Sequence, residues 1–229
     1  MCTVKNAVWT LSNGNLFFDV GIIEKYFSDN ENNKPITDYN LDLTNFFDDL
    51  DKLKNIPYEV FQKNKKETID LLKKALIIKA KDINILDEND IVVHIRSGDL
   101  FLQERSFSFY TPPPLSYYTN ILNNIKYNKI IIVSEDKKNP VIDELLKLYS
   151  NSIYSKNCLK DDIRIILGAK NIINSVGSFI PSLIMLSSNI SKVYGTWLYE
   201  KELEKYYVCN KHGTWKNTKI QRDYMLNYQ

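Results

Sequence analysis

The sequence predicts an α/β protein whose C-terminal half contains a doubly wound parallel β-sheet. Two short apolar runs, IVVHI at 91–95 and KIIIVS at 129–134, have the pattern of strands that are buried on both faces. Segments with the apolar spacing of a helix follow each run, at 115–125 and 140–149. Strands that alternate with helices form right-handed βαβ units, and these units build a parallel sheet with helices on both faces.

The same alternation continues toward the C-terminus. A helical pattern at 161–169 precedes the strand pattern NIINSV at 171–176. A second helical pattern at 178–188 precedes the short strand pattern KVYGT at 192–196. The helix expected before this stretch begins with Pro140, and proline is tolerated in the first helical turn because the amide N–H there has no partner within the helix.

The first half of the chain has weaker patterns. Residues 4–20 contain two apolar segments around a polar turn, which predict two short strands. The segment ETIDLLKKALIIKAK at 67–81 predicts an amphipathic helix, and the polar residues 87–90 predict a linker. We therefore expect a small N-terminal α/β region over 1–88 and the doubly wound domain over 89–229.

The charge and the apolar content argue against two classes of partner. The chain has 30 basic and 28 acidic side chains, whereas proteins that bind the phosphate backbone of nucleic acids usually carry a clear basic excess. A membrane-spanning helix needs about 18 or more consecutive apolar residues, and the sequence has no such run. We expect neither a nucleic-acid partner nor a membrane span.

Cysteine and histidine usage argues against a metal site and a disulfide framework. The residues concerned are scattered and form no CxxC pair: Cys2, Cys158, Cys209, His94 and His212. The first 14 residues have no apolar stretch behind a basic leader, so no signal peptide is predicted. These features favour a reducing, cytoplasmic compartment and a protein that needs no metal.

Three polar clusters follow the predicted strands, at 94–99, 134–136 and 175–179. In doubly wound sheets the carboxyl ends of the strands meet at one edge, and ligands bind beyond that edge. The clusters are therefore expected to lie close together. This shared position is the main argument from the residues for a binding site.

The first cluster, His94–Asp99, has the residues of an anion-binding loop. Arg96 alternates with His94, so both side chains are expected on one side of the strand end. An arginine can fork two hydrogen bonds to a diphosphate. Gly98 permits a positive φ or a close approach of the backbone, and Asp99 can orient Arg96. The alternative is a surface arginine that pairs with Asp99.

The third cluster offers a second set of phosphate donors. Gly177 and Ser178 precede the helix expected at 178–188, so free backbone N–H groups and the positive end of the helix dipole point beyond the sheet. Ser178 can bond a phosphate oxygen, with Phe179 beside it. The alternative is that Ser178 serves only as the helix N-cap.

Two further acidic positions are candidates for ligand contacts. Asp162 is expected at the start of a helix, where a carboxylate could accept hydrogen bonds from the N1–H and N2–H of guanine. The alternative is a favourable acid in the first helical turn. Ser134, Glu135 and Asp136 either contribute to the site or form a polar turn that caps the next helix.

The segment YTPPPLSYY at 110–118 has two interpretations. It predicts a rigid aromatic loop beside the site, because proline restricts the backbone and tyrosine can stack on sugars. The alternative is a proline-rich approach to the helix at 115–125.

Taken together, three segments resemble the motifs of the fucosyltransferase superfamily, which contains α-1,2-, α-1,6- and protein O-fucosyltransferases. HIRSGDLF at 94–101 resembles the HxRxGD motif, and the Ser-Glu-Asp at 134–136 resembles the polar end of the second motif. DIRIILGAKNIINSVGSF at 162–179 resembles the third motif, which runs from an Asp to a serine-rich helix start. The motifs occur in the family's order, and the resemblance covers about 91–195.

The resemblance implies a two-domain GT-B-like fold with a Rossmann-like nucleotide-sugar-binding domain, inversion at the anomeric carbon and no metal. In such an enzyme Arg96 would contact the β-phosphate and stabilise the leaving GDP. His94 and Asp99 would complete the catalytic loop, and Asp162 would recognise guanine. The remaining donor-binding positions would be Gly98, Ser134, Asp136, Gly177, Ser178 and Phe179.

The sequence also departs from the family at two places. The glycine-rich GxGNQ segment is reduced to Ser-Asn-Gly-Asn at 12–15, and Ile180 stands where the third motif has a serine. The acceptor-side region over 1–88 is correspondingly short. Our leading hypothesis is transfer of fucose from GDP-fucose to a glycan hydroxyl. The alternatives are a non-catalytic nucleotide- or glycan-binding module and a transferase that uses another nucleotide sugar.

Overall fold

A computed structural model describes most of the C-terminal half of the chain. The described residues are 66–67, 69–70, 73–74, 76, 78, 82–102, 110–156, 158–177, 179–196, 200–209 and 214–229. The two strands expected within 4–20 and the candidate Ser178 lie outside them.

The chain divides into two compact units. One comprises Met1–Asp82 with Pro181–Leu186, and the other comprises Ile83–Ile180 with Ser187–Gln229. The boundary expected at residues 88 and 89 stays a prediction, because most of the first region lies outside the described residues. The fold and the candidate site described below belong to the second unit, apart from Pro181–Leu186, which belong to the first.

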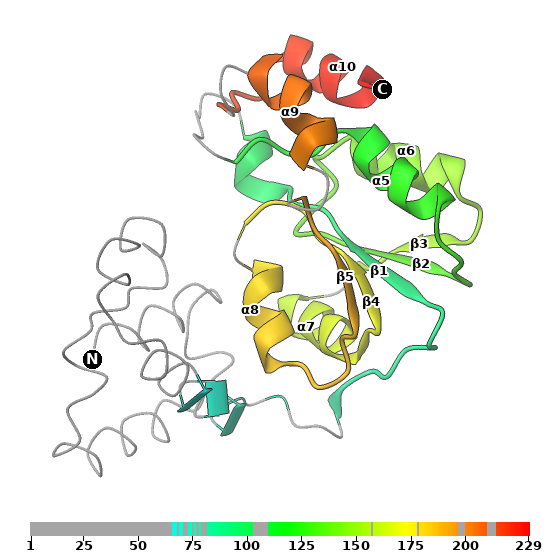
Figure 1. Cartoon of the computed structure of the whole chain (residues 1–229), viewed down its shortest axis with the longest axis vertical. Helices are drawn as coiled ribbons and strands as arrows, with labels where there is room; N and C mark the ends of the chain where they lie inside the picture. The colour runs from blue at the N-terminus through cyan, green and yellow to red at the C-terminus, as the bar shows by residue number, and fades with distance from the viewer. Residues whose placement is uncertain are drawn as a thin grey trace, which may run out of the picture. The chain divides into compact units, whose positions relative to one another are not determined.

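The second unit contains a five-stranded sheet in which every pair of neighbouring strands is parallel (Figure 1). The strand order is β3-β2-β1-β4-β5. This confirms the predicted α/β class and the parallel sheet. The order is that of the first five strands in doubly wound dinucleotide-binding sheets, and it reverses direction between β1 and β4. The strands are β1 Ile91–His94, β2 Ile130–Val133, β3 Ser152–Tyr154, β4 Asn171–Ile173 and β5 Lys192–Tyr194.

The central strands form where the sequence has consecutive β-branched residues. Every residue of β1 and β2 is buried, as expected for strands covered on both faces. Strand β3 was not predicted. It has three residues, lies at the edge of the sheet, and leaves the side chain of Ile153 45% exposed, so it lacks the continuous apolar pattern of a central strand.

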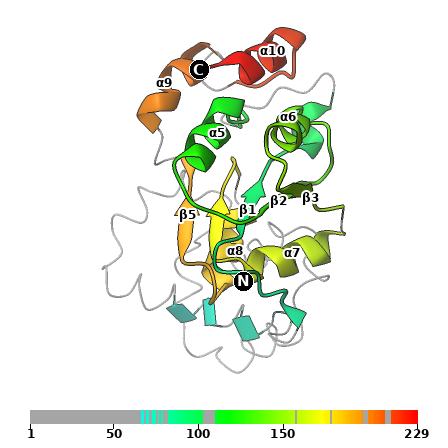
Figure 2. The ribbon, with the colours of Figure 1, turned by 90° about the vertical axis from the view of Figure 1, so that its right-hand side faces the viewer.

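Helices cover both faces of the sheet. In both views α5 and α6 lie on one side of the strands and α7 lies on the other (Figures 1 and 2). The four helices expected after residue 89 are present, with starts and ends that differ by at most two residues, whereas α9 and α10 were not predicted. The helices are α5 Leu115–Asn123, α6 Val141–Leu148, α7 Leu159–Gly168, α8 Phe179–Leu186, α9 Glu200–Cys209 and α10 Lys219–Asn227.

The C-terminal helices hold the loops that border the carboxyl edge of the sheet. The hydroxyl of Tyr206 in α9 donates a hydrogen bond of 2.8 Å to the carbonyl of Pro112. The indole N–H of Trp215, which is fully buried, donates one of 2.7 Å to the carbonyl of Leu100. Leu100 belongs to the short 3₁₀ helix Gly98–Phe101, which directly follows the β1 loop. The tail of the chain therefore fixes the loop that carries Arg96.

Helix α10 begins with a complete capping box. The side chain of Thr218 accepts a hydrogen bond from the N–H of Gln221, and the side chain of Gln221 accepts one from the N–H of Thr218. The Thr-x-x-Gln spacing was a sequence signal for this helix start. Among the described residues, no helix combines the length and apolar character needed to cross a membrane.

Candidate functional site

The three predicted polar clusters meet at the carboxyl edge of the sheet. His94 is the last residue of β1, Ser134 follows β2, and Asn174 follows β4. The strands β2, β1 and β4 are direct neighbours, so their ends lie side by side. Edge strand β3 adds Ser155, whose N–H donates a hydrogen bond of 2.8 Å to the carbonyl of Ile132 in β2.

The loops after β1 and β2 are tied together by side chains. The hydroxyl of Ser97 donates to Asp136 Oδ1 over 2.5 Å, and the N–H of Gly98 donates to the same oxygen over 3.3 Å. Asn139 donates its side-chain N–H to the carbonyl of Arg96 over 2.9 Å. The two loops therefore behave as one structural element around Arg96.

Arg96 is paired with two carboxylates. Its Nη2 lies 2.7 Å from Asp99 Oδ1, and its Nη1 lies 2.6 Å from Glu135 Oε1. The ion pair with Asp99 is the alternative interpretation that the sequence left open for Arg96. The ion pair with Glu135 was not predicted. The side chain of Arg96 remains 27% exposed. Phosphate binding by Arg96 stays a prediction.

Gly98 has the backbone conformation that the sequence suggested. Its φ is +54°, in the left-handed region that side chains disfavour. A Cβ at this position would also overlap Glu135 Oε2. The backbone conformation therefore favours glycine here, and any other residue would also displace the carboxylate of Glu135.

Asp136 links the loops after β1 and β2 through hydrogen bonds to both. Burial would raise the pKa of its carboxyl, but hydrogen bonds from Ser97, Lys138 and the N–H of Gly98 outweigh burial and hold the pKa at about 2. Lys138 also places its Nζ 2.9 Å from Asp136 Oδ2. Both carboxylate oxygens are thus engaged within the protein, and donor binding by Asp136 stays a prediction.

His94 is a neutral, buried imidazole. Burial, and then the positive charge of Arg96, lower its pKa to about 3, and the opposing interaction with Asn174 does not outweigh them. The ring is 5% exposed, and its centroid lies 5.7 Å from that of Phe179 in α8. A neutral imidazole presents one donor and one acceptor nitrogen.

Buried polar atoms without a hydrogen-bond partner gather at this edge of the sheet. In the described part of the chain, Arg96 Nε and Ser134 Oγ have no partner. The side chains of His94 and Asn174, and those of Ser175 and Tyr118, face each other but do not reach ordinary hydrogen-bond geometry. Such atoms are rare in native proteins, where nearly all buried polar groups are satisfied. Their concentration beside the reversal of strand order between β1 and β4 indicates a place for a polar ligand.

The segment before α5 adds one more such atom, Thr111 Oγ1, and the first turn of α5 places the hydroxyl of Tyr118 near that of Ser175. The adjacent Tyr117 anchors this segment, because its hydroxyl donates to the carbonyls of Asn174 and Tyr194 over 2.8 and 3.0 Å. Residues 111–114 and 117–118 of this segment are therefore a buried border of the candidate site, whereas Tyr110 is exposed. Neither the sugar-stacking role nor its alternative is decided by this position.

Asp162 lies in the first turn of α7 with its side chain turned toward the end of β3. The hydroxyl of Ser155 donates a hydrogen bond of 2.8 Å to Asp162 Oδ1. Burial, despite this hydrogen bond, raises the pKa of the carboxyl to about 6, and the nearby Asp161 adds to the increase. A buried acid whose pKa is raised at the edge of a sheet is typical of functional positions.

The third cluster shows only part of the expected phosphate cradle. Gly177 has a φ of +104°, and a Cβ there would meet no atom within 4 Å. Glycine is therefore needed for the backbone conformation and not for lack of space. Phe179 begins α8 beside His94, while the contribution of Ser178 stays a prediction.

The part of the chain that the structure describes contains no group of three or more His, Cys, Asp and Glu side chains that could hold a metal ion. The predicted absence of a metal requirement stays a prediction.

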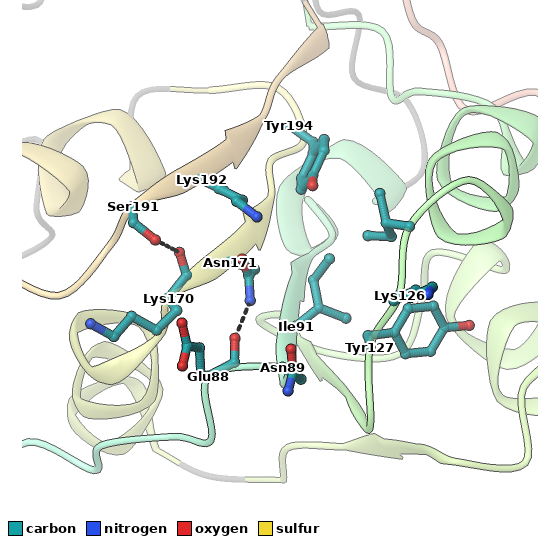
Figure 3. A pocket seen from close by; sticks show the side chains of 11 residues that line it. Glu88, Asn89, Ile91, Lys126, Tyr127, Lys170, Asn171, Ser191, Lys192 and Tyr194 are labelled. Carbon is teal, nitrogen blue, oxygen red and sulfur yellow. Dashed lines mark hydrogen bonds between the residues drawn. The ribbon is translucent and has the colours of Figure 1, made fainter.

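A hollow of about 320 Å³ lies at the opposite end of the sheet (Figure 3). At this end Asn171, the first residue of β4, is bonded to the segment that leads into β1. Its side-chain amide donates hydrogen bonds to the carbonyls of Glu88 and Asp90. Ligands of parallel sheets bind beyond the carboxyl ends, so this hollow is not the expected place for the site. Its lining comprises Glu88, Asn89, Ile91, Ile125, Lys126, Tyr127, Lys170, Asn171, Ser191, Lys192 and Tyr194.

Some site residues were missed by the sequence reasoning. Asn139 accepts from the N–H of Val141 and donates to the β1 loop, and its position before Pro140 was a recognisable turn signal. Ser155 was missed because it follows β3, the strand that was not predicted. Asn174 lies just before the third cluster, and only its buried side chain, which faces His94, marks it.

Comparison of the chain with protein-family models, with curated proteins and with solved structures finds no match.

Proposed function

We propose that the second unit binds a nucleotide sugar at the carboxyl edge of its sheet and that the chain is a GT-B-like glycosyltransferase. The reaction we favour moves fucose from GDP-fucose to a glycan hydroxyl. The observation that carries the proposal is the group of unpaired buried polar atoms beside the reversal of strand order. A buried polar atom without a partner costs about 1–3 kcal/mol, so a polar ligand that bonds Arg96 Nε or Ser134 Oγ would recover free energy at this edge.

The chemistry of a departing diphosphate supports the choice of ligand. In an inverting transfer, the acceptor oxygen forms a bond to the anomeric carbon while the bond from that carbon to the β-phosphate oxygen breaks. The electron pair leaves with GDP, and a base takes the proton of the acceptor hydroxyl. Arg96, at the tip of the β1 loop, would stabilise the charge that develops on the leaving group.

The base-binding end of the ligand would lie beyond β3 and α7. Asp162 Oδ1 accepts a hydrogen bond from Ser155. In the complex the carboxylate of Asp162 would also accept hydrogen bonds from the N1–H and N2–H of guanine. Adenine offers no such pair of donors. This role rests on the sequence resemblance, and the buried position of Asp162 is compatible with it.

A second candidate function is a non-catalytic nucleotide- or glycan-binding module. The pairing of Arg96 with both Asp99 and Glu135 favours it, because an arginine engaged within the protein is also what a purely structural loop would have. A transferase for another nucleotide sugar is the third candidate. Turnover with GDP-fucose and a mixture of glycan acceptors separates the first candidate from the other two.

The experiment that tests binding is thermal unfolding with GDP, UDP or ADP at matched concentrations. A ligand at about 100 times its dissociation constant stabilises the folded state by about 2.7 kcal/mol. We expect GDP to raise Tm by about 5 °C or more and the other nucleotides to raise it less. The shift should vanish in Arg96→Ala and persist in Lys147→Ala, which alters an exposed pair on α6. No shift with any nucleotide would contradict the proposal.

A further inference from the structure

The guanidinium of Arg96 is held from two sides. Asp99 binds Nη2 from the same loop, and Glu135 binds Nη1 from the loop after β2. A phosphate that arginine grips with two parallel hydrogen bonds needs such donors. The two carboxylates use two of the five N–H donors, so a phosphate that binds both Nη1 and Nη2 competes with them for the guanidinium.

The charges around Arg96 lead to the same conclusion. Three carboxylates, those of Asp99, Glu135 and Asp136, surround two cations, Arg96 and Lys138, so the group has a net charge of −1. Lys137, in the same loop, is paired with Asp143 at 3.1 Å. A diphosphate is repelled by a negative group at these distances. Removing one carboxylate from the group makes it neutral.

Glu135 is the carboxylate best placed to leave. Asp136 is held through both oxygens, whereas Glu135 has its ion pair with Arg96 as its hydrogen-bonded contact among the described residues. Its side chain is 46% exposed, compared with 37% for Asp99. The partial burial of this side chain raises the pKa of Glu135 despite Arg96, and Asp99 and Asp136 add to the increase.

The backbone also leaves room for this carboxylate. Glu135 Oε2 lies over Gly98, at a place that a Cβ would fill. The carboxylate thus lies against the backbone of Gly98, and its departure would free Nη1 of Arg96 for a ligand.

We propose that Glu135 is a positioning residue that holds Arg96 while the site is empty and yields it to the phosphates of the ligand. This inference rests on the proposed nucleotide-binding function. A phosphate competes with the carboxylate of Glu135 for Arg96, whereas an uncharged nucleoside or free sugar does not. Glu135 therefore lowers the affinity of the site for a diphosphate, since the ion pair must first be broken, and leaves the affinity for uncharged ligands unchanged.

The test is isothermal titration calorimetry of the full chain with GDP, inorganic pyrophosphate and guanosine. Glu135→Gln keeps the shape of the side chain and removes its charge. We expect it to tighten GDP and pyrophosphate about fivefold, which corresponds to about 1 kcal/mol for a partly exposed ion pair, and to leave guanosine unchanged. Asp143→Asn removes one charge from the pair with Lys137 and should change none of the three affinities.

The sign of the effect separates this role from a merely structural one. If Glu135 only supports the loop, Glu135→Gln weakens GDP and pyrophosphate or leaves them unchanged, and the inference is overturned. If pyrophosphate tightens but wild-type protein binds GDP no better than pyrophosphate, the nucleotide proposal fails and the role of Glu135 stands. If neither anion binds to either protein, both fail. Thermal unfolding without ligand verifies that the variant is folded.

Discussion

Replacing Asp162 with asparagine should make the protein more stable at neutral pH while weakening nucleotide binding. The pKa of this carboxyl is about 6 in the folded protein, compared with an ordinary value of 3.8. A difference of about two in pKa corresponds to about 3 kcal/mol, and relaxation of the site reduces it to about 2 kcal/mol. Asparagine can still accept the hydrogen bond from Ser155 and has no charge to bury.

The sign follows from proton binding. Because the pKa of Asp162 is higher in the folded state than in the unfolded chain, the folded state binds the proton more tightly. The contribution of this group to stability is therefore most favourable below about pH 4, falls between pH 4 and 6, and stays low above pH 6. Asp162→Asn should gain about 2 kcal/mol over wild type at pH 7.5 and much less at pH 4.5.

Urea unfolding of the two proteins at pH 4.5 and 7.5 measures this difference. Asp161→Asn is the matched control. The hydrogen bond from Arg164 lowers the pKa of Asp161, so its removal should slightly destabilise the protein at pH 7.5. An Asp162→Asn variant that is less stable than wild type at pH 7.5 would refute the reasoning. The loss of the GDP-induced shift in Tm should accompany the gain in stability.

Two further predictions concern the structure around the site. Trp215→Phe removes the hydrogen bond to Leu100 and leaves a cavity, so the free energy of unfolding should fall by about 1–3 kcal/mol in urea titrations, with weaker GDP binding as the β1 loop loosens. Asp136→Asn should cost about 1–2 kcal/mol at pH 7. Because the pKa of Asp136 is about 2 in the folded state, below its ordinary 3.8, this contribution is present above about pH 4 and is lost as the pH falls through 2. If the loss of unfolding free energy in Asp136→Asn stayed the same from pH 7 to pH 2, the role given to Asp136 would be wrong. If Trp215→Phe were as stable as wild type, the role given to Trp215 would be wrong.

Strands and helices with continuous or periodic apolar patterns were predictable. The runs at 91–95 and 129–134 became β1 and β2, because a strand covered on both faces needs apolar residues on both faces. Strand β3 has no such requirement at the sheet edge, and its three residues are recognisable only once Ile131 pairs with Ile153. Helix α10 was missed even though its capping box was present in the sequence.

The candidate site was predictable as a location but not as a set of contacts. The position of His94 and Ser134 at strand ends follows from local patterns. The partner of Arg96 cannot be deduced from local patterns, because Glu135 is 39 residues away and is adjacent to a second acid, Asp136. Which of the two faces the guanidinium depends on the path of the loop between β2 and α6.

The sequence by itself determined the α/β class, the parallel strands and the edge of the sheet where polar side chains gather. These properties depend on continuous apolar runs and on apolar spacing with the 3.6-residue period of a helix, which are local patterns. Only the tertiary structure decided that Arg96 lies between two carboxylates, that His94 is neutral and that Asp162 keeps its proton up to about pH 6. Ion pairing and burial depend on neighbours from distant parts of the chain, and these become neighbours only when the strands assemble.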